Sequence, residues 1–341
     1  MRIMFVGDIN LGEYYTSFGH GPLSFLKNNN VFENVQNLFD MADCVVGNLE
    51  AGLTNHKLNL NEPESVVLRG DPSSSSILKK AGFKFLQVAN NHTVQHGKDG
   101  FDETIQSLLG QGIVPIGQNN QDLATIEISG KRVGFLAASD VPDNTDKNQS
   151  CYQAITDDFL EKVTKSVDAV DYLFVLFHWG LEASTQPMEY QRSLTTKLVN
   201  LGVKGIIGSH PHLFYEVWLE QNAVAAPSLG DFIFDLGWDK RLLNSGILDI
   251  EIIDEKLKVQ IWPVELKENG CLPTLSGKAV EVTNSVIIHD NGENMKGEEI
   301  RKLYYFFTNL HKGNFLLKFK FISRKFFPFL KPKKIEETPN G

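Results

Sequence analysis

Apolar strand patterns alternate with amphipathic helix patterns over about the first 210 residues, and this alternation constrains the fold more than any other feature. Buried strands are predicted at residues 3–6, 44–46, 83–89, 172–177 and 204–207, with a hairpin at 123–128 and 131–137. Helices are predicted at residues 31–41, 74–82, 98–109, 157–167 and 188–201. Because a helical crossover lays the next strand parallel to the last, the pattern predicts an α/β fold with a largely parallel sheet and outer helices.

After residue 212 the pattern becomes all-β. Strands are predicted at residues 213–219, 223–226, 232–234, 247–253 and 257–264. We expect these late strands to form a second sheet packed on the first. Residues 143–150 are predicted to be a polar loop, and residues 267–300 a polar connector with little periodicity.

The composition is that of a globular protein. Of the 341 residues, 42% are hydrophobic and 22% charged, which excludes a disordered chain and a coiled coil. No stretch approaches the roughly 18 uninterrupted apolar residues of a membrane-spanning helix, and the apolar N-terminus is too short for a secretory signal. Three scattered cysteines form neither a disulfide framework nor a metal motif. We expect a cytoplasmic protein.

The net charge of −9 is unevenly distributed. Residues 301–341 contain ten basic and two acidic residues, which leaves 23 basic and 40 acidic residues, a net charge of −17, for the rest of the chain. An acidic body argues against nucleic acid as a partner. Cations and aromatic residues interleave from 301 to 335. This pattern fits either a terminal segment packed on the domain or a peripheral contact with the inner face of an anionic membrane.

Polar side chains that can carry chemistry follow the predicted strands. The residues at five strand ends are Asp8, Asn10, Glu50, Asn90, Asn91, His92, His178, His210 and His212. Open α/β sheets place their ligand sites at this edge. Each residue alone has a structural explanation: an Asp or Asn in a turn, or a hydrogen-bonded core histidine. Their occurrence together favours a shared site.

The ligand types indicate which metals would bind. Imidazole, carboxylate and amide oxygen suit Mn, Fe or Zn better than metals that prefer thiolate. Six or seven such ligands exceed one tetrahedral site and indicate two divalent metal ions, bridged by an oxygen ligand. We therefore expect a metal-dependent hydrolase.

Six motifs occur in a distinctive order: Gly7-Asp8, Asn48-Leu49-Glu50, Ala89-Asn90-Asn91-His92, His178-Trp179-Gly180-Leu181-Glu182, Gly208-Ser209-His210-Pro211-His212 and Ser228-Leu229-Gly230-Asp231-Phe232. Through them the chain resembles the CapA-like poly-γ-glutamate (capsule) biosynthesis proteins, a variant branch of the calcineurin-like metallophosphoesterase superfamily. The resemblance implies the calcineurin-like metallophosphoesterase fold, a four-layer αββα sandwich. It spans residues 1–265, which leaves a connector at 266–300 and a basic aromatic C-terminal extension at 301–341.

The resemblance also implies roles for individual residues. One metal would be held by Asp8, Glu50 and His212 with Asn10 nearby, and the other by Glu50, Asn91, His178 and His210, with Glu50 bridging. His92 would be catalytic, as the general acid that protonates the leaving group. Trp179 and Glu182 are candidates for contact with a metal ligand or with substrate, and Asp231 is a candidate for substrate contact. Asn10 stands where the wider superfamily has His, and Asp231 stands where the capsule branch has Asn.

The function that the resemblance implies is metal-dependent hydrolysis or transfer in the synthesis of a capsule or poly-γ-glutamate-like surface polymer. The partner would be a polyanionic polymer or a phosphorylated or γ-glutamyl substrate. The alternative is a non-catalytic, metal-stabilised subunit of a polymer synthase that binds polymer or serves as a scaffold.

Overall fold

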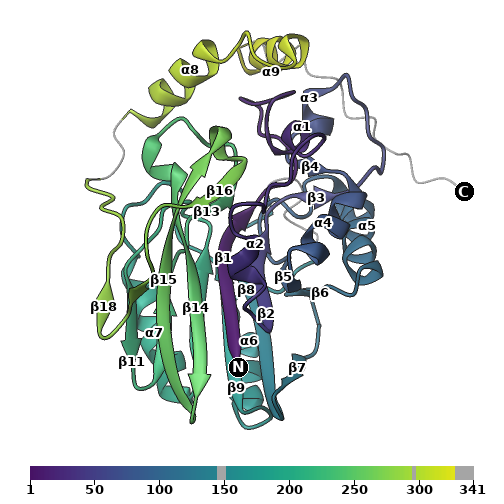
Figure 1. Ribbon diagram of the computed structural model, residues 1–341. Helices are drawn as coiled ribbons and strands as arrows, with labels where there is room; N and C mark the ends of the chain where they lie inside the picture. The colour runs from purple at the N-terminus through teal and green to yellow at the C-terminus, as the bar shows by residue number, and fades with distance from the viewer. Residues whose placement is uncertain (144–150, 294–296, 327–341) are drawn as a thin grey trace, which may run out of the picture.

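The computed structural model describes residues 1–143, 151–293 and 297–326. Two sheets pack face to face and helices cover their outer faces, which gives four layers (Figure 1). The four-layer αββα sandwich expected of a calcineurin-like metallophosphoesterase is therefore confirmed. The first sheet consists of β16 (Leu272–Leu275), β15 (Lys256–Lys267), β14 (Asn244–Ile253), β1 (Arg2–Ile9), β2 (Cys44–Leu49), β5 (Phe83–Gln87) and β6 (Val114–Ile116), with β13 (Asp231–Ile233) beside β1 and β17 (Val280–Glu281) beside β15.

The second sheet contains the other long parallel strands. Its order is β18 (Ser285–Val286), β11 (Val217–Glu220), β12 (Ala223–Ala226), β10 (Gly205–Ser209), β9 (Tyr172–His178), β8 (Lys131–Ser139) and β7 (Ala124–Ile128). Strands β8, β9, β10 and β12 are parallel. The hairpin of β7 and β8 turns at Ser129 and Gly130, whose φ angles of 53° and 73° are those of a two-residue hairpin turn. The predicted hairpin is confirmed.

The core has three layers because the central strands are buried on both faces. In β1, Ile3 and Phe5 face the second sheet, whereas Met4 and Val6 face the helices of the first. The helices are α1 (Pro22–Phe25), α2 (Gln36–Phe39), α3 (Pro63–Val66), α4 (Ser75–Lys80), α5 (Gly97–Gly110), α6 (Asp157–Val167), α7 (Glu189–Leu201), α8 (Glu298–Thr308) and α9 (Phe315–Phe326). The short strands β3 (Gly52–Leu53) and β4 (Arg69–Gly70) pair with each other.

The late strands do not form a sheet of their own, contrary to the sequence-based expectation. Strands β14, β15 and β16 extend the first sheet beside β1, whereas β11 and β12 join the second. In its described residues, the expected connector at 266–300 contains three short strands, β16, β17 and β18, that pair with the two sheets. Hydrophobic alternation identifies a strand but not its neighbour, because pairing depends on contacts distant in sequence.

Two predicted elements are much shorter than expected. Within the helix predicted at 31–41, only Gln36–Phe39 is helical, and turns precede it. Phe32 packs against Phe39, Phe83 and Phe232, so tertiary packing shapes this segment. The strand predicted at 213–219 begins only at Val217, the first residue of β11. The loop predicted at 143–150 lies almost entirely outside the described residues.

Helices α8 and α9 cross the end of the molecule opposite the N-terminus (Figure 1). Phe306 is buried, and Phe321 stacks on Tyr15 with ring centroids 4.3 Å apart. Lys318 is fully buried and donates hydrogen bonds to the backbone oxygens of Asn309 and Lys312. The described part of the basic extension is therefore packed on the body, and residues 327–341 lie outside the described chain. Within the described ranges, no helix is long and apolar enough to cross a membrane.

Candidate metal centre

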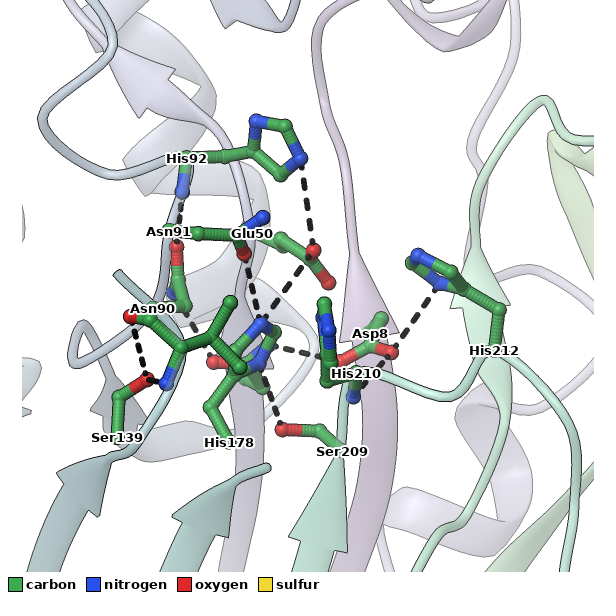
Figure 2. Close-up of polar contacts among 12 residues, drawn as sticks. Asp8, Glu50, Asn90, Asn91, His92, Ser139, His178, Ser209, His210 and His212 are labelled. Carbon is green, nitrogen blue, oxygen red and sulfur yellow. Dashed lines mark hydrogen bonds and ion pairs between the residues drawn. The ribbon is translucent and has the colours of Figure 1, made fainter. Parts of the chain in front are cut away.

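The predicted ligand residues converge at the carboxyl ends of strands from both sheets (Figure 2). Asp8 lies near the end of β1, Glu50 directly after β2 and His178 at the end of β9. His210 and His212 follow β10, and Asn91 follows β5. Parallel strands place their carboxyl ends at one edge of a sheet, and the facing of the two sheets brings both edges together. The convergence that the sequence predicts is therefore present.

One side of the cluster is built around Asp8. Its Oδ2 lies 3.4 Å from His212 Nδ1 and accepts a hydrogen bond from the backbone N–H of His210 at 3.2 Å. Asp231 pairs with Asp8 in the parallel ladder of β1 and β13, and its Oδ1 lies 2.8 Å from His212 Nδ1. This close pairing requires glycine at position 7, where a Cβ would lie 1.8 Å from the oxygen of Gly230.

The other side is built around Glu50 and His178. His178 Nε2 donates to Asn91 Oδ1 at 2.8 Å and lies 3.7 Å from Glu50 Oε1. Its Nδ1 lies 3.1 Å from Ser209 Oγ. The rings of His178 and His210 have centroids 4.6 Å apart. Several ligand atoms thus surround one small volume.

The donor set fits divalent metal ions. Three groups of buried side chains have ligand atoms within 4.8 Å of one another: Glu50, His210 and His212; Asp8, His212 and Asp231; Asp8, Glu50 and His178. Both carboxylate oxygens of Glu50, Nδ1 of His210 and Oδ2 of Asp231 are buried without a hydrogen-bond partner among the described residues. Such atoms are costly to bury, and a metal would satisfy them.

The three groups share residues, and two of the groups combine residues from both of the ligand sets that the resemblance implies. Glu50 belongs to two of them, in keeping with a bridging carboxylate. Asp231 falls among the candidate ligands, where sequence reasoning had placed it in contact with substrate.

Glu50 and Asp231 hold protons more tightly than usual. Burial and the nearby Asp8 carboxylate raise the pKa of Glu50 well above its ordinary value. Burial raises the pKa of Asp231 to about 7, although His212 opposes the shift. Burial lowers the pKa of His212, but Asp231 and Glu50 outweigh that effect and hold the pKa well above its usual range. A metal would replace these protons.

The other two histidines are neutral. Burial, with the neighbouring His210, holds the pKa of His178 well below its ordinary value. Burial, with the neighbouring His212, lowers the pKa of His210 to about 4. Neutral imidazole is the form that binds a metal.

The backbone at the two ligand histidines is strained. His210 and His212 have φ angles of 96° and 60°, in the left-handed region that side chains other than glycine rarely occupy. Pro211 separates them. This conformation turns the backbone N–H of His210 toward Asp8 and both imidazoles toward the cluster.

His92 lies beside the cluster. Its Nδ1 donates to Gln95 Oε1 at 2.7 Å, which directs Nε2 toward Glu50 Oε1, 3.9 Å away. Burial lowers the pKa of His92, although the Gln95 hydrogen bond opposes this. The side chain is thus oriented toward the site where the reacting groups would lie.

Two of the expected residues have other contacts. Asn10 donates to Asp235 Oδ1 and accepts from the backbone N–H of Gly12, so both ends of its amide are used within the protein. Trp179 is fully buried, donates to the Pro227 oxygen and packs in the core behind the second sheet. The expectation that Trp179 contacts substrate is not supported. Glu182 lines the cavity beside His92.

Sequence reasoning gave no role to several residues that orient the ligands. Asn48 donates to Asp8 Oδ1 at 2.7 Å, and Asn90 donates to Asn48 Oδ1 and to the Leu49 oxygen. Both belong to the strand-end motifs, so their position was a usable signal. Gln95 is three residues beyond His92 in a turn, and Ser209 is the residue before His210. Contacts of this kind fix the orientation of ligating side chains.

Two cavities adjoin the cluster. The first is lined by His92, Glu182, His212, Trp238 and Lys302 among others, and has a volume of about 20 Å³. The second is lined by Asn91, His210, Glu182 and neighbouring residues, and has a volume of about 580 Å³. Because ligand pockets commonly measure about 300–1,000 Å³, the second cavity is the wider route to the cluster.

A model of the bacterial capsule synthesis protein PGA_cap family matches residues 2–236. The PGA biosynthesis protein CapA of Bacillus subtilis (strain 168) is 27% identical over 284 residues, 77% of this chain and 71% of that protein. The capsule biosynthesis protein CapA of Bacillus anthracis is 26% identical over 292 residues, 81% and 70% of the two chains. A solved phosphatase from Mycoplasma pneumoniae is 13% identical, with a TM-score of 0.47, over 90% of this chain and 98% of that one. The chain belongs to the bacterial capsule synthesis protein family PGA_cap.

Proposed function

We propose that the protein is a metal-dependent hydrolase or transferase of the metallophosphoesterase type that acts in the synthesis of a capsule or poly-γ-glutamate-like polymer. The observation that carries the proposal is the buried cluster of Asp8, Glu50, His178, His210 and His212. A buried group of carboxylates and imidazoles with unpartnered ligand atoms is expensive unless it holds a cation. Membership of a capsule synthesis family supports the biological setting.

The candidate ligands have the following roles in this proposal. Asp8, Glu50, His178, His210 and His212 would hold the metals, with Asn91 and Asp231 beside them. Bound divalent metals would supply Lewis-acid polarisation of a phosphoryl or carbonyl oxygen and activation of water. The metals would be Mn, Fe or Zn, for which this donor set is suited.

His92 would move the proton. Its Nδ1–H is held by Gln95, so Nε2 faces the cluster, and in the doubly protonated form of the ring Nε2–H would give a proton to the oxygen or nitrogen of the leaving group. Glu182, which lines both cavities, lies where it can contact the substrate.

The test is a screen of the purified, metal-loaded protein against model phosphoesters and γ-glutamyl peptides. We expect turnover that needs metal and that His92→Ala reduces. Absence of turnover by a protein that holds its metals would contradict the proposal.

The second candidate is a non-catalytic, metal-stabilised subunit that binds polymer or acts as a scaffold. The narrowness of the cavity beside His92 favours it, because about 20 Å³ admits only about one water-sized group. Polymer binding without turnover in the same screen would support this function.

We further propose peripheral contact with an anionic membrane through residues 301–335. Apolar side chains remain exposed on the described helices: Ile300, Tyr304, Phe307, Phe315, Leu316, Phe319 and Phe326. Several cations of these helices, in contrast, pair with carboxylates of the body or of α8. We therefore expect measurable but modest sedimentation with anionic vesicles. Equal sedimentation with neutral vesicles would contradict an anionic preference.

A further inference from the structure

Helix α8 forms one wall of the small cavity beside the metal cluster. Glu298 and Lys302, one turn apart on α8, line this cavity together with His92, Glu182 and His212. Trp238 completes this wall. All three of Trp238, Glu298 and Lys302 lie beyond the residues 2–236 that the family model matches. This wall is therefore an addition to the matched segment.

Two residues of this wall, Lys302 and Trp238, have side chains that contain hydrogen-bond donors. The Lys302 side chain is 15% exposed, and its Nζ lies 5.0 Å from the centroid of the Trp238 ring. The indole N–H of Trp238 is buried and has no acceptor among the described residues. A buried donor without a partner is costly, and Lys302 places a positive charge over the ring of the same side chain, so an oxygen anion is the ligand whose charge suits both groups.

We propose that Lys302 and Trp238 form a subsite that binds an anionic oxygen of the substrate, from a carboxylate or a phosphate, next to the metal cluster. The inference rests on the proposed function, since it names the class of substrate: one that bears a negative group beside the reacting bond. The cavity volume of about 20 Å³ leaves room for about one water-sized group, which suits an oxygen that reaches in.

Glu298 occupies this subsite from within the protein. Its carboxylate forms an ion pair with Lys302 from the preceding turn of α8. Burial lowers the pKa of Lys302, but Glu298 together with the charge of Glu182 outweighs burial, and the net shift is upward, so Lys302 is a cation at neutral pH. A substrate anion must therefore compete with Glu298. Removal of the Glu298 charge should tighten anion binding, whereas removal of the Lys302 charge should weaken it.

The experiment compares two pairs of variants. Lys302→Met and Glu298→Gln change the subsite, and Lys325→Met and Glu299→Gln are matched controls. The control side chains, 48% and 73% exposed, pair with each other and do not line the cavity. Calorimetry measures the affinity of the metal-loaded proteins for inorganic phosphate and for γ-linked triglutamate, and elemental analysis checks that the metal content is equal.

We expect Lys302→Met to weaken the affinity for the preferred anion about 10-fold or more, and Glu298→Gln to strengthen it several-fold. The controls should match wild type, and the tighter-binding probe identifies carboxylate or phosphate as the group. Equal affinity of Lys302→Met and wild type, equal effects of Glu298→Gln and Glu299→Gln, or no binding of either anion would overturn the subsite. Because binding is measured without turnover, the subsite can hold even if the proposed catalysis fails.

Discussion

The cluster of candidate metal ligands and the C-terminal helix pair, α8 and α9, both depend on charged side chains, but they use them differently. In the cluster, Glu50 and His210 are buried and keep ligand atoms without a partner. On the helix pair, charges are matched across the surface: Arg301 pairs with Asp239, and Arg324 with Glu62 at 2.6 Å. The first arrangement is incomplete without a cation. The two ion pairs of the second arrangement are complete within the protein.

This difference distinguishes a site that can bind an ion from a surface on which one part of the protein packs against another. Exposed ion pairs contribute about 0–1 kcal/mol each, so the helix pair is held by many small contacts and by the burial of Phe306. The cluster concentrates its unsatisfied groups in one place, so a single bound ion would change its energy more than any surface contact can. The following experiments test whether the two regions respond as differently as this comparison requires.

The largest effect is expected for His210→Ala. Because His210 shares a group of ligand atoms with Glu50 and His212, its loss should remove at least one metal. Elemental analysis of the purified variant measures this. His56→Ala is the control, since His56 pairs with Asp99 and belongs to none of the ligand groups. Full metal retention by His210→Ala would contradict the cluster assignment.

His92→Ala should separate chemistry from binding within the cluster region. If His92 protonates the leaving group, kcat should fall by about 10²–10⁴-fold while metal content stays near wild type. The loss should shrink for esters with good leaving groups, which need less protonation. An unchanged kcat on a poor leaving group would show that His92 has a structural role.

Much of this cluster was predictable because strand ends and motifs coincide. Asp8, His178 and His210 were placed by the strand pattern alone. Trp179 was misassigned for a physical reason: successive residues of an extended strand point to opposite sides, so the neighbour of His178 faces the core. Asp231 reaches the cluster through the register of β13 with β1, which no local pattern reveals.

The fold shows the same division. The α/β alternation and the hairpin at Ser129 followed from period and turn chemistry. The sharing of late strands between the two sheets did not, because each strand is equally apolar in either place. Lys302 carries no motif, and it reaches the cavity only because α8 folds back over the strand ends. A single sequence does not indicate which of its distant segments pack against each other.

Proton release on metal binding is the effect of intermediate size. It should occur at the cluster but not at the surface ion pairs. With a pKa of about 7, Asp231 is mostly protonated at pH 6, and Glu50 also has a raised pKa. Metal binding must displace these protons, so affinity should rise as the pH rises through about 7.

The same shifts affect stability without metal. A carboxyl group with a raised pKa binds more protons in the folded than in the unfolded state, so its contribution to the free energy of unfolding falls as the pH rises from about 4 to 7.

Calorimetric titration of the protein with metal, in two buffers of different ionisation enthalpy, should show more protons released on metal binding at pH 6 than at pH 8. Asp231→Asn should release fewer at pH 6. Equal release at both pH values would contradict the shifts.

The smallest effect concerns the helix pair. Phe321→Ala removes the stack on Tyr15 and should reduce the free energy of unfolding by about 1–2 kcal/mol. Phe319, which is 56% exposed on the same helix, is the matched control, and Phe319→Ala should change stability by less than about 0.5 kcal/mol. Thermal unfolding of metal-loaded protein measures both. Metal content should not change in either variant, and a loss of metal would show that the two regions are coupled.

The left-handed backbone at His210 implies a trade-off between activity and robustness. At a φ of 96°, glycine is unstrained whereas alanine is not, and the backbone N–H that contacts Asp8 survives either change. The free energy of unfolding should therefore be about 1–2 kcal/mol higher for His210→Gly than for His210→Ala, and His210→Gly should unfold at a higher temperature. Neither variant keeps the imidazole. Selection for stability alone would favour glycine at this position. If His210 holds a metal as proposed, the histidine at this position keeps a candidate ligand at the cost of a less stable fold.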